Sequence, residues 1–257
     1  MAVTDTQRRE ERRISPVFWA LVAVLGTSAW AVITDYGQSI RVGIFLFVVS
    51  GWVVSLCLHE YAHARTALHG GDITVGAKGY LRLNPFTYSH AVLSILLPVL
   101  FILMGGIGLP GGAVFIERGR IHGRWKHSLI SAAGPLVNLA CAIVLLVPLG
   151  LGLLDSVRIE FRAAVAFLGF LQVTATILNL LPVPGLDGYG IIEPWLSYNF
   201  RRQVEPFAQF GLLAVFGLLW IPEVNAVFFD GVYRLFSALG VSPVLASYGD
   251  SLFRFWK

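Results

Sequence analysis

Long apolar runs are the feature that most constrains how this chain can fold. Several of them approach the roughly 20 residues that a helix needs to cross a bilayer. They occupy residues 17 to 34, 42 to 58, 91 to 107, 128 to 152, 160 to 182 and 207 to 221. Hydrophobic residues make up 56% of the chain and charged residues only 13%, against roughly 25% charged residues in soluble domains. The sequence therefore predicts an all-α, multi-pass membrane protein with about five to six transmembrane helices.

Short polar connections join these runs, and neither an internal repeat nor a low-complexity tract separates them. We therefore predict one integral membrane domain over residues 1–257, with its core at about 42–200. The formal charge of +4 comes from short basic clusters beside apolar runs, a pattern that orients membrane loops. We expect the lipid bilayer as a partner and nucleic acid as none, and the sequence indicates no particular oligomeric state.

Three segments depart from the pattern of a continuous helix. Pro98 and the glycines from 105 to 112 interrupt the run at 91–107, which favours a re-entrant segment over a full crossing. Residues 72–82 and 112–118 carry β-branched and aromatic residues between glycines, which indicates short β-strands.

One motif carries recognisable chemistry, the run His59-Glu60-Tyr61-Ala62-His63 at the end of an apolar segment. Histidines at positions i and i+4 share one face of a helix and can hold one zinc ion, with the glutamate between them as a general base. Composition alone predicts far less than one such pattern in this chain. A pair of hydrogen-bonded core histidines is the alternative, but ionisable groups in a membrane segment are costly and indicate function.

A catalytic zinc ion needs a third protein ligand and an open position for water. The acidic residues near apolar segments are Asp72, Glu117, Asp187 and Glu193. Asp187 stands out because it follows a proline-glycine break after the run at 160–182, and irregular backbone at membrane depth lines a cavity or is buried in protein. A plain aspartate in an interfacial turn is the alternative.

Three motifs in this order resemble the site-2 protease family of intramembrane zinc metalloproteases, in its small subgroup without PDZ or CBS domains. They are the HEYAH helix, the segment Gly134-Pro135-Leu136-Val137-Asn138, and the segment from Asn179 to Gly188 with the pattern NxxPxPxxDG. The resemblance implies that Asp187 is the third zinc ligand. It also implies that Asn179 contacts the substrate backbone, although an amide there could equally form an interhelical hydrogen bond.

The resemblance implies a zinc endopeptidase with one Zn²⁺ per chain, held by His59, His63 and Asp187, and with Glu60 as the catalytic base. Its substrates would be transmembrane helices of other proteins, cut in regulated intramembrane proteolysis. The predicted strands resemble the family's membrane-associated strands, which could add to an unwound substrate or form only a structural hairpin.

A membrane metal transporter or metal-sensing protein with the same ligands is the alternative function. Glu60 discriminates between the two, because a protease needs a base that is not a ligand and a transporter does not. A catalytically inactive relative is disfavoured, since all four expected chemical residues are present.

The metal motifs also predict a topology. His63 and Asp187 must lie at one face of the membrane, each near the C-terminal end of its apolar run, so the two helices should run in the same direction. Of the intervening runs, 91–107 is the weakest candidate for a crossing. The basic residues from Arg118 to Lys126 then share a side with the arginines at the N-terminus, which predicts a cell-membrane protein with a cytoplasmic N-terminus and the site toward the cytoplasmic face.

Overall fold

The computed structural model describes residues 13–37, 39–88 and 114–256. Almost all of the regular structure in these ranges is helical, and none of it is a β-strand. The longer helices are α2 (Pro16–Thr34), α3 (Ile40–Gly70), α6 (Arg124–Gly150), α7 (Ile159–Asn179), α10 (Gly211–Leu219), α11 (Pro222–Ala238) and α12 (Pro243–Phe253). The shorter ones are α4 (Thr74–Ala77), η1 (Tyr80–Arg82), η2 (Arg118–Arg120), α8 (Asp187–Ile192), η3 (Glu193–Trp195), α9 (Tyr198–Val204) and η4 (Glu205–Phe210).

Four helices of the described residues, α2, α3, α6 and α7, are long and apolar enough to cross a membrane. A fifth crossing is possible if the segment Tyr198–Leu219 and helix α11 form one broken span, bent by 98°. The apolar run at 207–221 therefore does not form a straight crossing, because α10 ends at Leu219 and α11 begins at Pro222, a residue that suits the first turn of a new helix. The prediction of a multi-pass, helical membrane protein is confirmed, with four or five candidate spans among the described residues.

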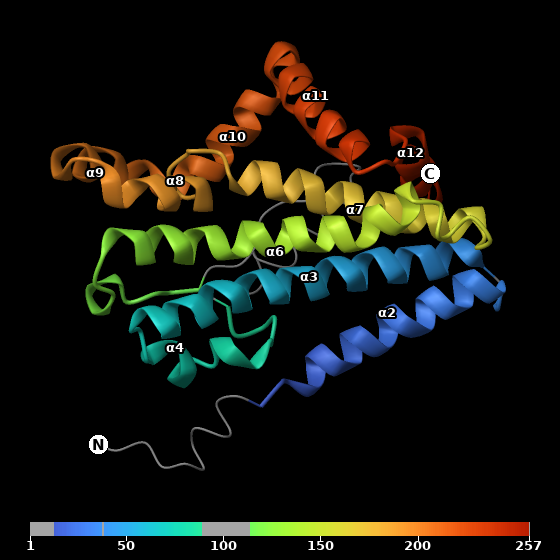
Figure 1. Cartoon of the computed structure of the whole chain (residues 1–257), viewed down its shortest axis with the longest axis horizontal. Coiled ribbons are helices and arrows are strands. Elements are labelled where there is room, and N and C mark those ends of the chain that lie inside the picture. Colours follow the sequence, from blue (N-terminus) through green and yellow to red (C-terminus); the bar gives the residue numbers. More distant parts are fainter. Residues whose placement is uncertain (1–12, 38, 89–113, 257) are drawn as a thin grey trace.

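Helices α3, α6 and α7 form the centre of the molecule, and α6 packs against both of the others (Figure 1). Glycines allow close approach at these contacts, as small residues do in membrane bundles. A Cβ atom on Gly51 of α3 would lie 2.6 Å from Leu168 of α7, and one on Gly169 of α7 would lie 2.4 Å from Leu146 of α6.

In Figure 1, α3 and α7 run in the same direction and α6 runs in the opposite one. The predicted relation between the two helices that carry the metal motifs is therefore confirmed. Lys126 at the start of α6 donates a hydrogen bond to the carbonyl of Gly70 at the C-terminal end of α3 (3.3 Å). These two helix ends therefore lie side by side. The chain thus leaves α3 and enters α6 at the same end of the bundle. The predicted re-entrant segment at 91–107 lies outside the described residues.

The prediction of a strand at 72–82 is wrong, since this segment forms the helical turns of α4 and η1. The Asp72 carboxylate accepts hydrogen bonds from the backbone N–H and the hydroxyl of Thr74, which starts a helical turn. Gly79 then adopts a left-handed conformation (φ 78°) just after α4. This backbone conformation is incompatible with the continuous extended strand that we predicted.

The strand predicted at 112–118 is also absent from its described part. Residues 114 to 117 are irregular and η2 follows them. The two segments do lie side by side, but side chains connect them. Asp72 accepts a hydrogen bond from the Glu117 backbone (2.8 Å), and Lys78 donates one to the Phe115 carbonyl (3.2 Å). These side-chain bonds use the groups that a strand ladder would have paired.

Candidate metal centre

The C-terminal part of α3 brings two histidines to one buried face. His59 and His63 are one helical turn apart, and their side chains are almost completely buried. Their Nε2 atoms lie 3.0 Å from each other. Two ring nitrogens at this distance, both directed at the same point, are the arrangement that a shared metal ion requires.

Asp187 reaches the same point from a different part of the chain. Helix α7 ends at Asn179, as the prolines at 182 and 184 predict, because they cannot donate the backbone hydrogen bonds of a continuing helix. Gly185 takes a left-handed conformation (φ 92°) in the turn that follows, where a Cβ atom would lie 2.2 Å from the Ala208 carbonyl oxygen. Helix α8 then begins with Asp187 itself. This return of the chain places the carboxylate against the α3 histidines.

The three donor groups fit a zinc ion. Asp187 Oδ2 lies 3.2 Å from His59 Nε2 and 3.3 Å from His63 Nε2, so the three pairwise distances agree with one another. Ligands about 2.0–2.1 Å from a tetrahedral zinc ion lie roughly 3.3 Å apart. In the described part of the chain, these three residues are the group of metal-binding side chains that converge in this way.

Gly134 of α6 leaves room for the ion. A Cβ atom at this position would lie 2.3 Å from His63 Nε2 and 2.4 Å from His59 Nε2. These distances are close to the 2.0–2.1 Å of a zinc–nitrogen bond. The glycine therefore keeps open a space in front of both ring nitrogens, where any larger residue would place its own atoms.

A carbonyl group of α6 fixes the orientation of the second histidine. His63 Nδ1 lies 2.7 Å from the Ile130 backbone oxygen, which can only accept a hydrogen bond. Nδ1 must therefore carry a proton, so in the neutral, metal-binding form of the ring Nε2 presents its lone pair to the space beside Gly134. Such outer hydrogen bonds set the tautomer and raise the basicity of metal-ligating histidines.

Glu60 is buried beside this group, with 3% of its surface exposed. It interacts electrostatically with His59, His63 and Asp187, and the backbone of Val114 lies close enough to interact with its carboxylate. Its Oε2 atom is buried without a hydrogen-bond partner among the described residues. Burying a carboxylate oxygen without a partner costs free energy. We therefore expect Oε2 to interact with a molecule that binds at this site.

The other acidic residues that could have been the third ligand are used elsewhere. Asp72 is fully buried and holds Thr74 and the backbone of Glu117. Glu193 forms an ion pair with Arg118. Glu117 pairs with Arg120 and with Lys78, and these hydrogen bonds lower its pKa to about 2. Among the acidic candidates, the structure brings only Asp187 to the histidines.

The histidines also affect the charge state of Asp187. Burial alone would raise the pKa of this carboxyl group, but the neighbouring His63 and His59 outweigh burial, and the pKa is lowered. The group is therefore an anion at neutral pH, the form that binds a metal ion.

Contacts with α6 hold the helix that carries Asp187. The Ser128 hydroxyl donates a hydrogen bond to the Ile191 carbonyl (2.6 Å) and accepts one from the Trp195 indole nitrogen (3.0 Å). Trp125 packs edge-to-face on Trp195, with ring centroids 4.8 Å apart. Sequence analysis missed these positioning residues, because no spacing pattern connects the start of α6 with η3.

Asn179 ends α7 and is 3% exposed. No hydrogen bond reaches its side chain in the described part of the chain, and it does not belong to the converging metal-binding group. The alternative role of Asn179, an interhelical hydrogen bond, is thus not seen among the described residues, and its contact with a substrate stays a prediction.

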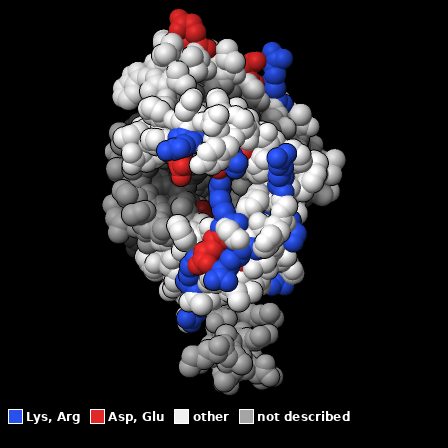
Figure 2. Space-filling view, turned by 90° about the vertical axis from the view of Figure 1, so that its left-hand side faces the viewer, with Lys and Arg blue, Asp and Glu red and all other residues white. Residues whose placement is uncertain are grey.

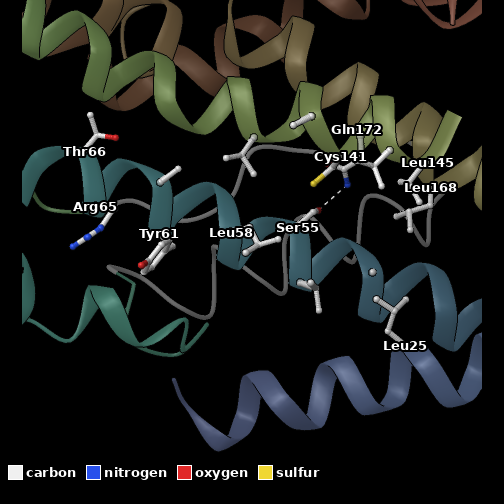
Figure 3. A pocket seen from close by; sticks show the side chains of 16 residues that line it. Leu25, Ser55, Leu58, Tyr61, Arg65, Thr66, Cys141, Leu145, Leu168 and Gln172 are labelled. Atoms are coloured by element: carbon white, nitrogen blue, oxygen red, sulfur yellow. Dashed lines mark hydrogen bonds between the residues drawn. The ribbon is translucent and has the colours of Figure 1, made fainter. Parts of the chain in front are cut away.

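An apolar cavity of about 650 Å³ lies along the neighbouring face of α3 (Figure 3). Its wall includes Leu58 and Tyr61 of α3, Cys141 of α6 and Leu25 of α2. Polar side chains are few, and two of them, Gln172 and Ser55, bond to each other (2.7 Å). Leu58 and Ala62, which line the cavity, directly precede the two histidines in the sequence, so the cavity borders the metal-binding face.

Charged side chains gather at the end of the molecule that holds this centre. Figure 2 faces this end and shows several Lys and Arg side chains, with fewer acidic side chains beside them, on a surface that is otherwise mostly uncharged. The ion pairs Arg118–Glu193, Lys78–Glu117 and Arg120–Glu117 belong to this region. The metal-binding residues thus lie near a polar end of a largely apolar molecule.

The chain is similar to several curated bacterial proteins over most of its length. It is 47% identical to Rip2 of Mycolicibacterium smegmatis over 252 residues, which cover 97% of this chain and 96% of that protein. It is 46% identical to Rip2 of Mycobacterium tuberculosis over 263 residues, which cover 99% of each chain. Identity to YwhC of Bacillus subtilis is 30% over 210 residues, which cover 75% of this chain and 92% of YwhC.

All three relatives are named as zinc metalloproteases. No family model matches the chain. No solved structure matches it either.

Proposed function

The chain belongs to the site-2 protease family of zinc metalloproteases, and on this basis we propose that it hydrolyses peptide bonds within transmembrane segments of other membrane proteins. The observation that carries the proposal is the convergence of His59, His63 and Asp187 on one point at the end of a membrane helix. These residues would hold one zinc ion per chain.

A zinc ion with an open coordination position polarises a peptide carbonyl and acidifies water. We assign the role of general base to Glu60, which is buried beside the donor group and is not one of the three donors. Its carboxylate takes a proton from the attacking water and later delivers that proton to the nitrogen of the leaving amine. The C–N bond breaks as the new carboxylate forms, so no covalent intermediate with the chain is needed.

The substrate has to unwind before this can happen. A transmembrane helix satisfies its carbonyl and amide groups internally, so the bond to be cut is not accessible in an intact helix. We assign to Asn179, a buried amide at the end of α7, the role of binding the exposed backbone. Helix-breaking residues near the cut should therefore favour cleavage.

We propose that the centre lies toward the cytoplasmic face and that the N-terminus is cytoplasmic. Arg118, Arg120 and Lys126 lie at the end of the molecule that holds the centre. At the other end, the connection between α6 and α7 and the first turn of α7 carry only two basic residues, Arg158 and Arg162. An excess of positive charge marks the cytoplasmic side of a membrane protein.

Metal transport with the same ligands is the competing function. A transporter needs donors for the ion but no buried carboxylate beside them that is not a ligand. The unpartnered Oε2 atom of Glu60 therefore favours hydrolysis.

The test is to place the purified protein in lipid vesicles with a single-span substrate and to compare it with the Glu60→Gln variant. We expect cleavage to fall by at least about a hundredfold with zinc content unchanged, because the variant loses the proton carrier and keeps the ligands. Glu160→Gln, the same change at the start of α7, is the control and should cleave normally. Undiminished cleavage by Glu60→Gln would refute the role of Glu60.

A further inference from the structure

The apolar cavity beside α3 is long and narrow. On α3 its lining residues begin at Gly51 and end at Thr66, and they recur every three to four residues along one face of the helix. This part of the helix rises about 22 Å, so a volume of about 650 Å³ leaves a mean cross-section of roughly 30 Å². An α-helix with its side chains is about 10–12 Å wide and needs roughly 80 Å² or more. The cavity is therefore too narrow to enclose a helix of another protein.

The wall of the cavity also argues against an unwound peptide as its occupant. Two of its few polar side chains, Ser55 and Gln172, bond to each other (2.7 Å), and the Ser55 hydroxyl donates a hydrogen bond to the Trp52 carbonyl (2.8 Å). An unwound peptide would leave most of its N–H and C=O groups unpaired there, which is costly at membrane depth. A hydrocarbon chain needs no such partners, so both the wall and the width fit an acyl chain.

The cavity is open on the side of α6. Ala140 and Val144 line it, and both are exposed. Helix α6 is one of the helices that are long and apolar enough to cross a membrane, so its exposed apolar residues face lipid. An acyl chain can therefore enter the cavity sideways from the bilayer.

The end of the cavity near the metal centre carries polar side chains. Figure 3 shows Arg65 and Thr66 at this end, and Leu25, Leu145 and Leu168 toward the other. Arg65 is partly buried, and its side chain forms no ion pair or hydrogen bond in the described part of the chain. A guanidinium group without a partner suits an anionic group that carries the hydrocarbon chain.

Other arginines at this end of the molecule have acidic partners within the chain. Arg118 pairs with Glu193, and Arg120 pairs with Glu117. Arg65 differs from both, because it lies at the mouth of an apolar cavity and lacks such a partner among the described residues. Basic side chains placed between membrane helices in this way bind anionic lipid head groups.

We propose that this cavity binds an anionic phospholipid, with one acyl chain along α3 and the phosphate group on Arg65. The acyl chain then covers Leu58 and Ala62, which directly precede the two histidines in the sequence. A bound lipid thus forms part of the surroundings of the metal centre. This inference does not require peptide hydrolysis and goes beyond the proposed function.

The test measures by native mass spectrometry how tightly the purified protein retains lipids in detergent. The two probes are phosphatidylglycerol, which is anionic, and phosphatidylcholine, which is zwitterionic, with the same acyl chains. We expect about one phosphatidylglycerol molecule per chain, bound roughly tenfold more tightly than phosphatidylcholine, as one charge-assisted contact predicts.

Two variants separate the charge from the cavity. Arg65→Gln should bind phosphatidylglycerol as weakly as phosphatidylcholine, because it removes the guanidinium group and leaves the cavity open. Ala140→Phe should weaken binding of both lipids by at least about fivefold, because the aromatic ring takes the place of part of the acyl chain. Arg124→Gln and Ala20→Phe are the matched controls. They make the same changes at exposed positions outside the cavity and should keep both wild-type affinities.

Equal affinity of the wild type for the two lipids would overturn the inference. So would a retained preference in Arg65→Gln, or wild-type affinities in Ala140→Phe. A single-span peptide that displaces the lipid, and that binds less tightly to Ala140→Phe, would assign the cavity to a protein helix and overturn the inference too. Peptide displacement is measured in the Glu60→Gln background, so no outcome depends on whether the chain hydrolyses peptide bonds.

Discussion

At the residue scale, the absence of a side chain at position 134 is as important as the three ligands. A methyl group there would occupy the space 2.3 Å and 2.4 Å from the two ring nitrogens. The helix around it offers no simple way to move that methyl group aside, because the backbone of α6 is fixed by its packing on α3 and α7. The glycine thus acts on metal binding without touching the metal.

We predict that Gly134→Ala loses zinc although every ligand is still present. Zinc per protein, measured by mass spectrometry of the metal, should fall from about one to less than about a tenth, because the methyl group takes the coordination space. Gly26→Ala in α2 is the control, since nothing lies within 4 Å of its added Cβ atom. Full zinc content in Gly134→Ala would contradict the location of the metal centre.

Sequence analysis predicted the residues of this centre unevenly. His59, Glu60 and His63 follow from helical periodicity alone, because they are neighbours on one turn. Asp187 comes from a distant segment. Its place after a proline-glycine break favoured it over three other acidic residues, and the resemblance to a known motif then implied that it is the third ligand. The function of Gly134 could not be predicted from spacing, since it depends on which helix packs against the histidines.

At the scale of elements, the segment around Glu117 connects α4 with the start of α6. Glu117 holds Arg120 and Lys78, and their hydrogen bonds lower its pKa to about 2. A carboxyl group with a lowered pKa stabilises the folded state above its ordinary pKa. That contribution is lost as the pH falls from the ordinary value of 4.5 through about 2.

We predict that Glu117→Gln unfolds at a lower temperature than wild type at pH 6 and at the same temperature near pH 2. The difference should also shrink in concentrated salt, because the group is at the surface and its ion pairs are screened. Thermal unfolding in detergent at several pH values measures this. A difference that stays constant down to pH 2 would show that charge on Glu117 is not its cause.

The same segment explains why the strand predictions failed. The residue types at 72–82 and 114–118 suit strands, but local hydrogen bonds from Asp72 to Thr74 start a helical turn first. Side-chain preference within a short segment cannot show which backbone groups are already bonded. In contrast, the end of α7 was predicted well, because two prolines exclude a continuing helix whatever surrounds them.

At the scale of the whole molecule, the metal centre constrains the directions of the two helices α3 and α7, which lead to its ligands. One shared ion requires the ends of α3 and α7 to meet, and both helices run toward that end (Figure 1). The proposed orientation of the loops can be tested by a labelling experiment.

We predict that a membrane-impermeant thiol reagent, added to intact cells, labels a cysteine at Leu153 and not one at His122. Leu153 lies in the exposed connection between α6 and α7, and His122 in the exposed loop before α6. The background lacks Cys57 and Cys141, and permeabilised cells serve as the control in which both positions react. Labelling of position 122 from outside, in active protein, would contradict the proposed orientation.

The most direct test of the central claim is the position of the bond that is cut. Wild-type protein and Glu60→Gln are incubated in lipid vesicles with a single-span substrate, and the products are identified by mass spectrometry. The account predicts new termini inside the apolar segment of the substrate. It also predicts loss of these products on zinc chelation or in Glu60→Gln, and their return when zinc is restored to the wild type. Cuts confined to the soluble flanks of the substrate, or products that persist in Glu60→Gln, would contradict it.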